Sequence, residues 1–209
     1  MITIEFARTL YPADADSAHD FDHVLRVVAM ADRIARAEGA ERDVVRAAAL
    51  LHDIGLGEGR AGHETSAANR AKEILREHGY DGTFCENVAH AIESHRFRSG
   101  PAPQTLEAKV LFDADKLDAI GAIGVARAFA FGAHRGQKLW GEVPSDYTDQ
   151  MNGIEADPRQ HTAVHEFHVK LSRIKERMFT AAGKQIAAER HAFMVKFYEQ
   201  LDREVRGAA

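Results

Sequence analysis

Apolar side chains recur at helical spacing along almost the whole of this 209-residue chain. Between residues 23 and 37 they return every three or four positions, as at Val24, Val27, Val28 and Ala31, and Gly39 then supplies a stop. Only residues 1–6 alternate like a β-strand. The periodicity therefore predicts an all-α fold.

The chain contains several further segments of this kind. The other expected helices lie at 42–51, 64–78, 84–95, 105–131, 161–179 and 184–206. Asp81 and Thr83 are candidate N-caps near residue 84, and Gly121 and Gly124 are candidate breaks in the fifth helix. Residues 132–158 are rich in Gly, Pro, Asp and Asn, which is typical of a long loop or lid.

The length fits one large domain that needs no disulfides. We expect a single domain over 1–209, in which a helical bundle at about 18–131 is followed by the loop and by a C-terminal helical extension at about 159–206. Cys85 is the one cysteine, which excludes an internal disulfide and a cysteine-based zinc finger and favours a reducing compartment.

The charge and the apolar runs limit the partners. The chain has 27 Lys and Arg against 32 Asp and Glu, a net charge of −5, which argues against nucleic acid as a partner. Residues 1–6 include a charge before any signal-peptide core can form, and no apolar run approaches the ~20 residues of a membrane span. We expect a cytoplasmic protein that does not bind membranes.

Histidine is abundant, with 12 copies, and several lie beside core-forming residues. His52 and Asp53 follow an Ala- and Leu-rich helix that ends near Gly55, His23 lies in an apolar stripe, and Asp115 stands among apolar neighbours. Burying two carboxylates is costly unless a divalent cation offsets their charge. The alternatives are an internal His–Asp hydrogen-bonded pair and plain surface exposure.

Two imidazoles and two carboxylates without a thiolate suit a hard or borderline divalent ion, namely Mn, Fe, Ni, Co, Zn or Mg. The order of His23, His52, Asp53 and Asp115 resembles the H…HD…D signature of the HD superfamily, whose members are largely metal-dependent phosphohydrolases with an all-α fold. Similarity to one branch of small bacterial HD hydrolases, which includes a pyrophosphohydrolase, extends over 19–27, 48–55, 113–127 and 190–194.

The resemblance implies an HD-domain helical bundle in which these four residues bind one divalent metal ion, with manganese among the candidates. It further implies hydrolysis of a phosphate ester or phosphoanhydride in a nucleotide or a related small metabolite. Three alternatives remain: a binuclear-iron HD-type oxygenase, a non-catalytic nucleotide-sensing module and a purely structural metalloprotein.

Cationic side chains near the expected ligands are candidates for holding the phosphate. In the family, the pair Asp115-Lys116 resembles a metal ligand followed by a phosphate-facing cation, so Lys116 is the first candidate for both catalysis and substrate binding. Arg127, three helical turns further on, and Arg26 are weaker substrate-binding candidates. Ordinary surface charge is an equally good interpretation of both arginines.

Three residues are further catalytic candidates. His63 and His95 could act as proton donors or phosphate contacts, and Glu58 could act as a general base. His63 and His95 also occur in the order that binuclear HD proteins use for a second metal. The gap from Asp53 to His63 is short for such proteins, so we favour one metal.

A second set of histidines occurs late in the chain. His161, His165 and His168 are spaced to share one helical face, which would permit another metal cluster, but their apolar neighbours favour structural roles. In the preceding loop, Trp140 and Tyr147 could stack on a nucleobase or simply pack against the protein.

Overall fold

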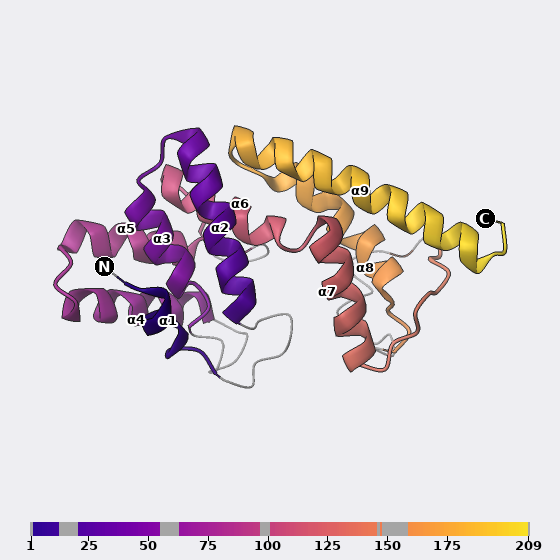
Figure 1. Cartoon of the computed structure of the whole chain (residues 1–209), viewed down its shortest axis with the longest axis horizontal. Helices are drawn as coiled ribbons and strands as arrows, with labels where there is room; N and C mark the ends of the chain where they lie inside the picture. Colours follow the sequence, from indigo (N-terminus) through magenta and orange to yellow (C-terminus); the bar gives the residue numbers. More distant parts are fainter. Residues whose placement is uncertain are drawn as a thin grey trace. The chain divides into compact units, whose positions relative to one another are not determined.

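The computed structural model describes residues 2–12, 21–54, 63–96, 101–145, 147 and 159–208, and these residues form helices and connecting segments without a strand. The all-α prediction is therefore confirmed (Figure 1). In chain order the helices are α1 (Ile4–Arg8), α2 (Phe21–Glu38), α3 (Arg42–Leu51), α4 (His63–Glu77), α5 (Gly82–Glu93), α6 (Leu106–Leu117), α7 (Gly121–His134), α8 (Ala163–Val169), the 3₁₀ helix η3 (Leu171–Arg177) and α9 (Ala181–Val205).

The strand predicted at 1–6 is wrong, because Ile4–Arg8 forms α1. The Thr3 side chain accepts a hydrogen bond from the Phe6 backbone N–H at 3.1 Å and caps the helix, and Ala7 is fully buried. A short alternating pattern does not outweigh an N-cap and a buried contact, since packing decides the state of so short a segment.

The expected single helix at 161–179 is also wrong, because the chain forms α8 and then η3. Leu171 and Ile174, both buried, lie three residues apart, which is the repeat of a 3₁₀ helix. The expected helix at 105–131 is interrupted at Gly121, where a φ of +79° suits glycine, and α7 continues to His134. Of the two candidate caps of α5, Asp81 fills the position.

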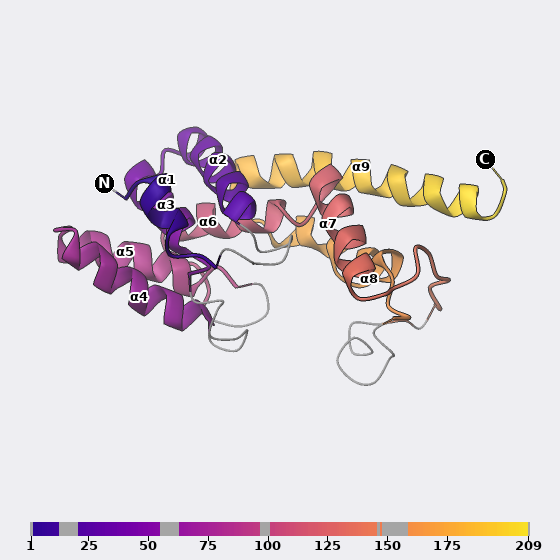
Figure 2. The same cartoon turned by 60° about the horizontal axis from the view of Figure 1, so that its bottom comes forward.

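The chain divides into two compact units, 1–116 with 178–183 and 117–177 with 184–209. In the first unit α3 contacts α1, α2 and α5, and α4 packs along α5 (Figure 2). Helix α3 is apolar around most of its circumference and buries seven of its ten residues, so it occupies the centre of this unit. Its C-terminal end leads directly into His52 and Asp53, which are called the HD dipeptide below.

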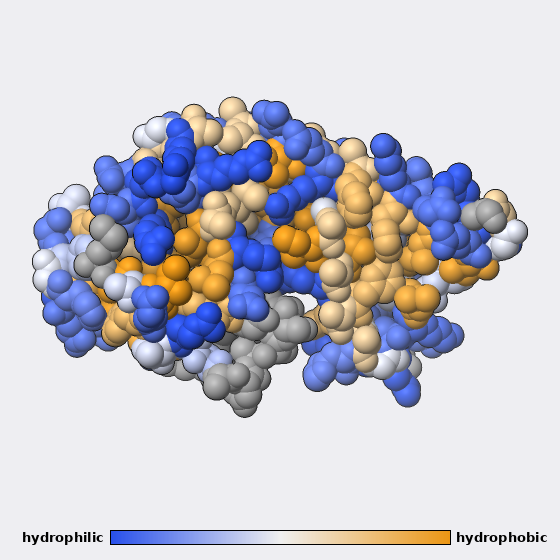
Figure 3. Space-filling view, viewed as in Figure 1, coloured by the Kyte–Doolittle hydropathy of each residue, from blue (hydrophilic) through white to orange (hydrophobic). Residues whose placement is uncertain are grey.

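The second unit contains α7, α8, η3 and most of α9. Its aromatic packing includes Phe167 of α8 stacked on Tyr198 of α9, with ring centroids 4.4 Å apart. Apolar side chains also gather over α7 on the face shown in Figure 3. Among the residues that the structure describes, no helix is long and apolar enough to cross a membrane.

Candidate metal centre

His52 stands at the end of α3, where it is fully buried. Its Nδ1 atom donates a hydrogen bond to the Ala49 carbonyl at 2.8 Å, the role that an Nδ1–H tautomer would take. The other ring nitrogen, Nε2, then carries the lone pair, and it is buried without any hydrogen-bond partner. An orphaned acceptor in a protein interior is costly, and a metal ion is one group that would satisfy it.

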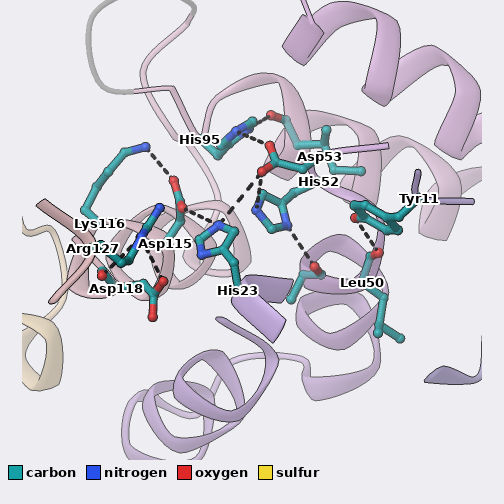
Figure 4. A network of polar contacts seen from close by, with 12 residues as sticks. Tyr11, His23, Leu50, His52, Asp53, His95, Asp115, Lys116, Asp118 and Arg127 are labelled. Atoms are coloured by element: carbon teal, nitrogen blue, oxygen red, sulfur yellow. Dashed lines mark hydrogen bonds and ion pairs between the residues drawn. The ribbon is translucent and has the colours of Figure 1, made fainter. Parts of the chain in front are cut away.

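Two other helices bring their side chains to the same place. His23 projects from the buried stripe of α2, and Asp115 comes from the last turn of α6 (Figure 4). One ligand atom each from His23, His52 and Asp115 can be chosen so that all lie within 4.8 Å of one another. His23 Nε2 is 3.4 Å from Asp115 Oδ1.

Asp53 completes the set of four residues predicted from the sequence. Its Oδ2 atom lies 3.4 Å from His52 Nε2 and 3.8 Å from His23 Nε2. Atoms that each lie about 2.1 Å from one ion are about 3 to 4 Å apart, whereas strong hydrogen bonds are shorter. The four side chains are buried or nearly so, which excludes plain surface exposure, and their spacing and donor types fit a divalent metal.

The electrostatics of the cluster favour ionised carboxylates. Burial acts to raise the pKa of Asp53, but the neighbouring imidazoles of His52 and His95 outweigh it, so the pKa falls below its ordinary value. Burial likewise opposes ionisation of Asp115, yet Lys116, followed by His23, holds its pKa well below the usual range. Both carboxylates are therefore available as anionic ligands at neutral pH.

His95 and Lys116 border this cluster. The Nε2 atom of His95 lies 3.7 Å from Asp53 Oδ1, whereas His23 and His52 contact Oδ2 of the same carboxylate. The Nδ1 atom of His95 contacts the Ile92 carbonyl. Burial, the largest influence, lowers the pKa of His95 to about 4. Lys116 Nζ lies 2.5 Å from Asp115 Oδ2, so the predicted phosphate-facing cation adjoins a predicted ligand.

Among the other sequence candidates, the structure describes the side chains of Arg26 and Arg127. Arg26 is half-buried on α2, one turn after His23. Arg127 belongs to the second unit, where it donates to the backbone carbonyl and to the carboxylate of Asp118, at 3.1 and 2.8 Å. Glu58 and the side chain of His63, which opens α4, lie outside the described residues.

The late histidines serve local structure, as the amphipathic pattern favoured. His161 contacts the Tyr147 hydroxyl at 2.7 Å and Glu166 at 3.0 Å, while His165 and Thr162 form a capping box at the start of α8. Within the ranges that the structure describes, they form no metal-binding group of the kind seen around His52. Tyr147 thus packs inside its own unit.

Sequence reasoning missed two contacts close to the centre. The Tyr11 hydroxyl donates to the Leu50 carbonyl at 2.9 Å, near the end of α3. The buried Glu64 carboxylate pairs with Arg96, which follows His95, at 3.0 Å. A lone tyrosine ahead of any motif gives no sequence signal, and an acidic residue in the first turn of a helix, such as Glu64, is explained by the helix dipole alone.

Comparisons with known proteins agree with this architecture. A model of the HD domain matches residues 20–120, the stretch that contains all four clustered side chains. The curated protein YpgQ of Bacillus subtilis, described as uncharacterized, is 34% identical over 198 residues, which cover 93% of this chain and 88% of that protein.

Solved structures extend the similarity to almost the entire chain. The crystal structure of B. subtilis YpgQ in complex with ADP is similar with a TM-score of 0.76 and 30% identity, covering 99% of this chain and all of the other. An HD-superfamily hydrolase from Bacillus thuringiensis gives a TM-score of 0.74 and 31% identity, covering 97% and 94%. The identity, the coverage and the buried His-Asp cluster show that the chain belongs to the HD-domain family.

Proposed function

We propose that this protein is a metal-dependent phosphohydrolase that cleaves a phosphate ester or phosphoanhydride in a nucleotide or a related small metabolite. The observation that carries the proposal is the buried, unpartnered Nε2 of His52, which faces His23 and Asp115 beside the Lys116 ammonium. That arrangement joins a fitting metal site to a cation suited to phosphate.

His23, His52, Asp53 and Asp115 would hold one divalent ion, with Mn, Fe, Ni, Co, Zn and Mg all compatible with two imidazoles and two carboxylates. When bound, such an ion supplies Lewis acidity and lowers the pKa of coordinated water. The hydrogen bond from His52 Nδ1 to Ala49 fixes the ring with Nε2 toward the cluster, so the site is oriented before any ligand enters.

Lys116 and His95 have separate roles in the proposal. The Lys116 ammonium is placed to neutralise a phosphoryl oxygen as negative charge develops during transfer, and this contribution is largely electrostatic. His95 is neutral near pH 7, because burial depresses its pKa, so its Nε2 can accept a hydrogen bond from the attacking water and orient it, whereas a pKa of about 4 makes it a weak general base. Its Nδ1 contact with Ile92 leaves Nε2 toward Asp53.

The nucleotide class rests on one comparison together with the chemistry of the site. YpgQ, which matches this chain along its whole length, has been crystallised with ADP. A phosphoanhydride carries several negative charges that a divalent ion and Lys116 would share, and a nucleotide therefore fits better than an uncharged metabolite.

A binuclear-iron oxygenase is the second candidate, and a specific contact favours it. His95 faces Asp53 Oδ1, whereas His23 and His52 face Oδ2, so the two oxygens of this carboxylate lie beside different histidines. A carboxylate in this position could bridge two metal ions, each with its own histidine ligands. Such an enzyme would contain two irons per chain and would consume oxygen. A sensing module would instead bind nucleotide without turnover.

The test begins with the metal content of the purified full-length protein. Nucleotides and phosphomonoesters are then screened with Mn²⁺, Co²⁺, Ni²⁺ and Mg²⁺, and released phosphate and pyrophosphate are measured separately. We expect about one metal per chain and metal-dependent release of one product. Two irons with oxygen uptake, or tight nucleotide binding without hydrolysis, would replace the proposal by the corresponding alternative.

A pair of histidine variants makes the screen specific. His52→Ala should lose both metal and hydrolysis, because it removes the buried Nε2. His78→Ala is the matched control: His78 also contacts a carbonyl of the preceding turn through Nδ1, at 2.8 Å from Ile74, but it is exposed. Equal metal content and activity in the two variants would contradict the proposed site.

A further inference from the structure

The N-terminal segment contacts the helix that carries the HD dipeptide, although the matched HD-domain model begins only at residue 20. The segment is fixed at several points. The Ile2 backbone N–H donates to the Tyr80 hydroxyl at 2.9 Å, α1 packs against α3, and the Arg8 guanidinium lies 4.3 Å from the centre of the Phe21 ring. Tyr11, which follows α1, is therefore held in a defined position.

The Tyr11 side chain touches two helices that bring expected metal ligands. Its ring meets Phe21 edge-on, with centroids 5.3 Å apart, and Phe21 begins α2 two residues before His23. Its hydroxyl donates to the Leu50 carbonyl, two residues before His52 (Figure 4). The charge of Asp53 and a hydrogen bond from the Asp53 backbone also act on the pKa of this phenol, after burial, so the hydroxyl lies close to the HD dipeptide.

The end of α3 explains why a donor is needed there. In a continuing α-helix the Leu50 carbonyl would accept from the N–H of residue 54. The Ile54 N–H instead lies 3.4 Å from the Leu51 carbonyl, as the chain turns out of the helix. Carbonyls in a final helical turn must find other donors, and Tyr11 supplies one to Leu50.

The neighbouring carbonyl, that of Ala49, also accepts a hydrogen bond from a side chain. Ala49 accepts from His52 Nδ1, so the two consecutive carbonyls of this turn are capped by the ligand itself and by Tyr11. A change in the direction of the Leu50 peptide would tilt the turn on which His52 and Asp53 stand. Groups that orient ligands in this manner commonly change metal affinity by ten- to a hundredfold when removed.

We propose that Tyr11 is a positioning residue of the metal centre, whose hydroxyl fixes the last turn of α3 and thereby aims His52 and Asp53 at the ion. This inference rests on the proposed function for the presence of the ion. It adds a residue from the N-terminal segment, beyond the matched HD-domain model, to the machinery of the site.

The test compares two phenol-to-phenyl variants of the full-length protein. Tyr11→Phe keeps the ring against Phe21 and removes the hydroxyl. Tyr80→Phe is the matched control, because it removes the other phenol that holds the N-terminal segment, at Ile2, and so loosens the segment without removing a donor to α3. Each protein is loaded with Mn²⁺, and the Mn²⁺ dissociation constant is measured by competition with a chelating dye.

We expect Tyr11→Phe to raise the dissociation constant at least tenfold, and Tyr80→Phe to change it less than twofold, with similar melting temperatures for the two variants. A Tyr11→Phe variant with the wild-type dissociation constant, or two variants that weaken binding equally, would overturn the proposal, because the hydroxyl would then serve only the fold.

A second readout separates this inference from the proposed function. Rates with a hydrolysed substrate should fall in kcat for Tyr11→Phe, with KM near the wild-type value, because Lys116 is not displaced. If the wild-type protein binds Mn²⁺ and hydrolyses no phosphate compound, the proposed function fails while the comparison of dissociation constants still decides the role of Tyr11. A wild-type protein that binds none of Mn²⁺, Fe²⁺, Co²⁺, Ni²⁺, Zn²⁺ and Mg²⁺ would overturn both.

Discussion

Acidification should destabilise this protein through His95. The side chain is buried beside Asp53, and burial lowers its pKa from 6.5 to about 4. The unfolded chain therefore binds one more proton than the native chain between about pH 6.5 and pH 4. Because an imidazole with a depressed native pKa stays neutral in the fold, the free energy of unfolding decreases as the pH falls through this window.

The size of the effect follows from the difference of about 2.5 pH units. At 1.36 kcal/mol per unit, His95 alone should reduce the free energy of unfolding by about 3 kcal/mol between pH 7 and pH 4. The slope approaches about 1.4 kcal/mol per pH unit in the middle of the window, where the unfolded imidazole is protonated and the native one is not.

The assay is urea unfolding of the metal-free protein at several pH values from 7 to 4.5. His95→Asn removes the titration while its amide can replace Nδ1 as the donor to Ile92, so this variant should show a slope smaller by about one proton. His78→Asn is the matched control, because it changes an exposed histidine that makes the same kind of contact and retains His95. An unchanged slope in His95→Asn, or a protonated native His95 at pH 6 by NMR, would refute the reasoning.

Three further predictions address the site. Lys116→Met should keep the metal and lower kcat on the order of 10²-fold, measured on one preparation, and normal turnover would remove Lys116 from the mechanism. Arg127→Met should lower the free energy of unfolding by about 1–3 kcal/mol through the lost contacts with Asp118; a raised KM with unchanged stability would instead make Arg127 a substrate contact. Chelation should lower the melting temperature, and metal affinity should weaken below about pH 6.5, because ligating imidazoles must be neutral; an unchanged melting temperature would argue against a metal centre.

Most helices were predictable where an amphipathic or buried pattern persisted over about three turns. The bounds of α3 match the expected 42–51, and α2 differs from the expected 23–37 by one or two residues at each end. Prediction failed for α1, which has only five residues, and at the α8–η3 junction, where spacing alone does not distinguish a continuous helix from a change to 3₁₀ geometry.

The candidate site was predictable to the extent that its residues belong to one signature. His23, His52, Asp53 and Asp115 were recognisable from their order and apolar neighbours, and the structure brings them together. Residues that support the site through hydrogen bonds to backbone atoms have no comparable sequence signature. The contact of Tyr11 with Leu50 depends on where a carbonyl points at a helix end, which only the folded chain defines.

The HD dipeptide shows how the helical core and the site depend on each other. Adjacent residues inside a helix point about 100° apart, so His52 and Asp53 could not both address one ion from the middle of α3. His52 is the C-cap of α3, with φ −63° and ψ −31°, and the chain turns directly after it. Because α3 is buried around most of its surface, its end lies inside the first unit. Two ionisable side chains buried there need a common partner such as a metal ion, and the carbonyls of the last helical turn need hydrogen-bond donors. Burial of α3 thus creates the electrostatic requirement that a metal ion would meet, and the turn after Leu51 provides the geometry for it.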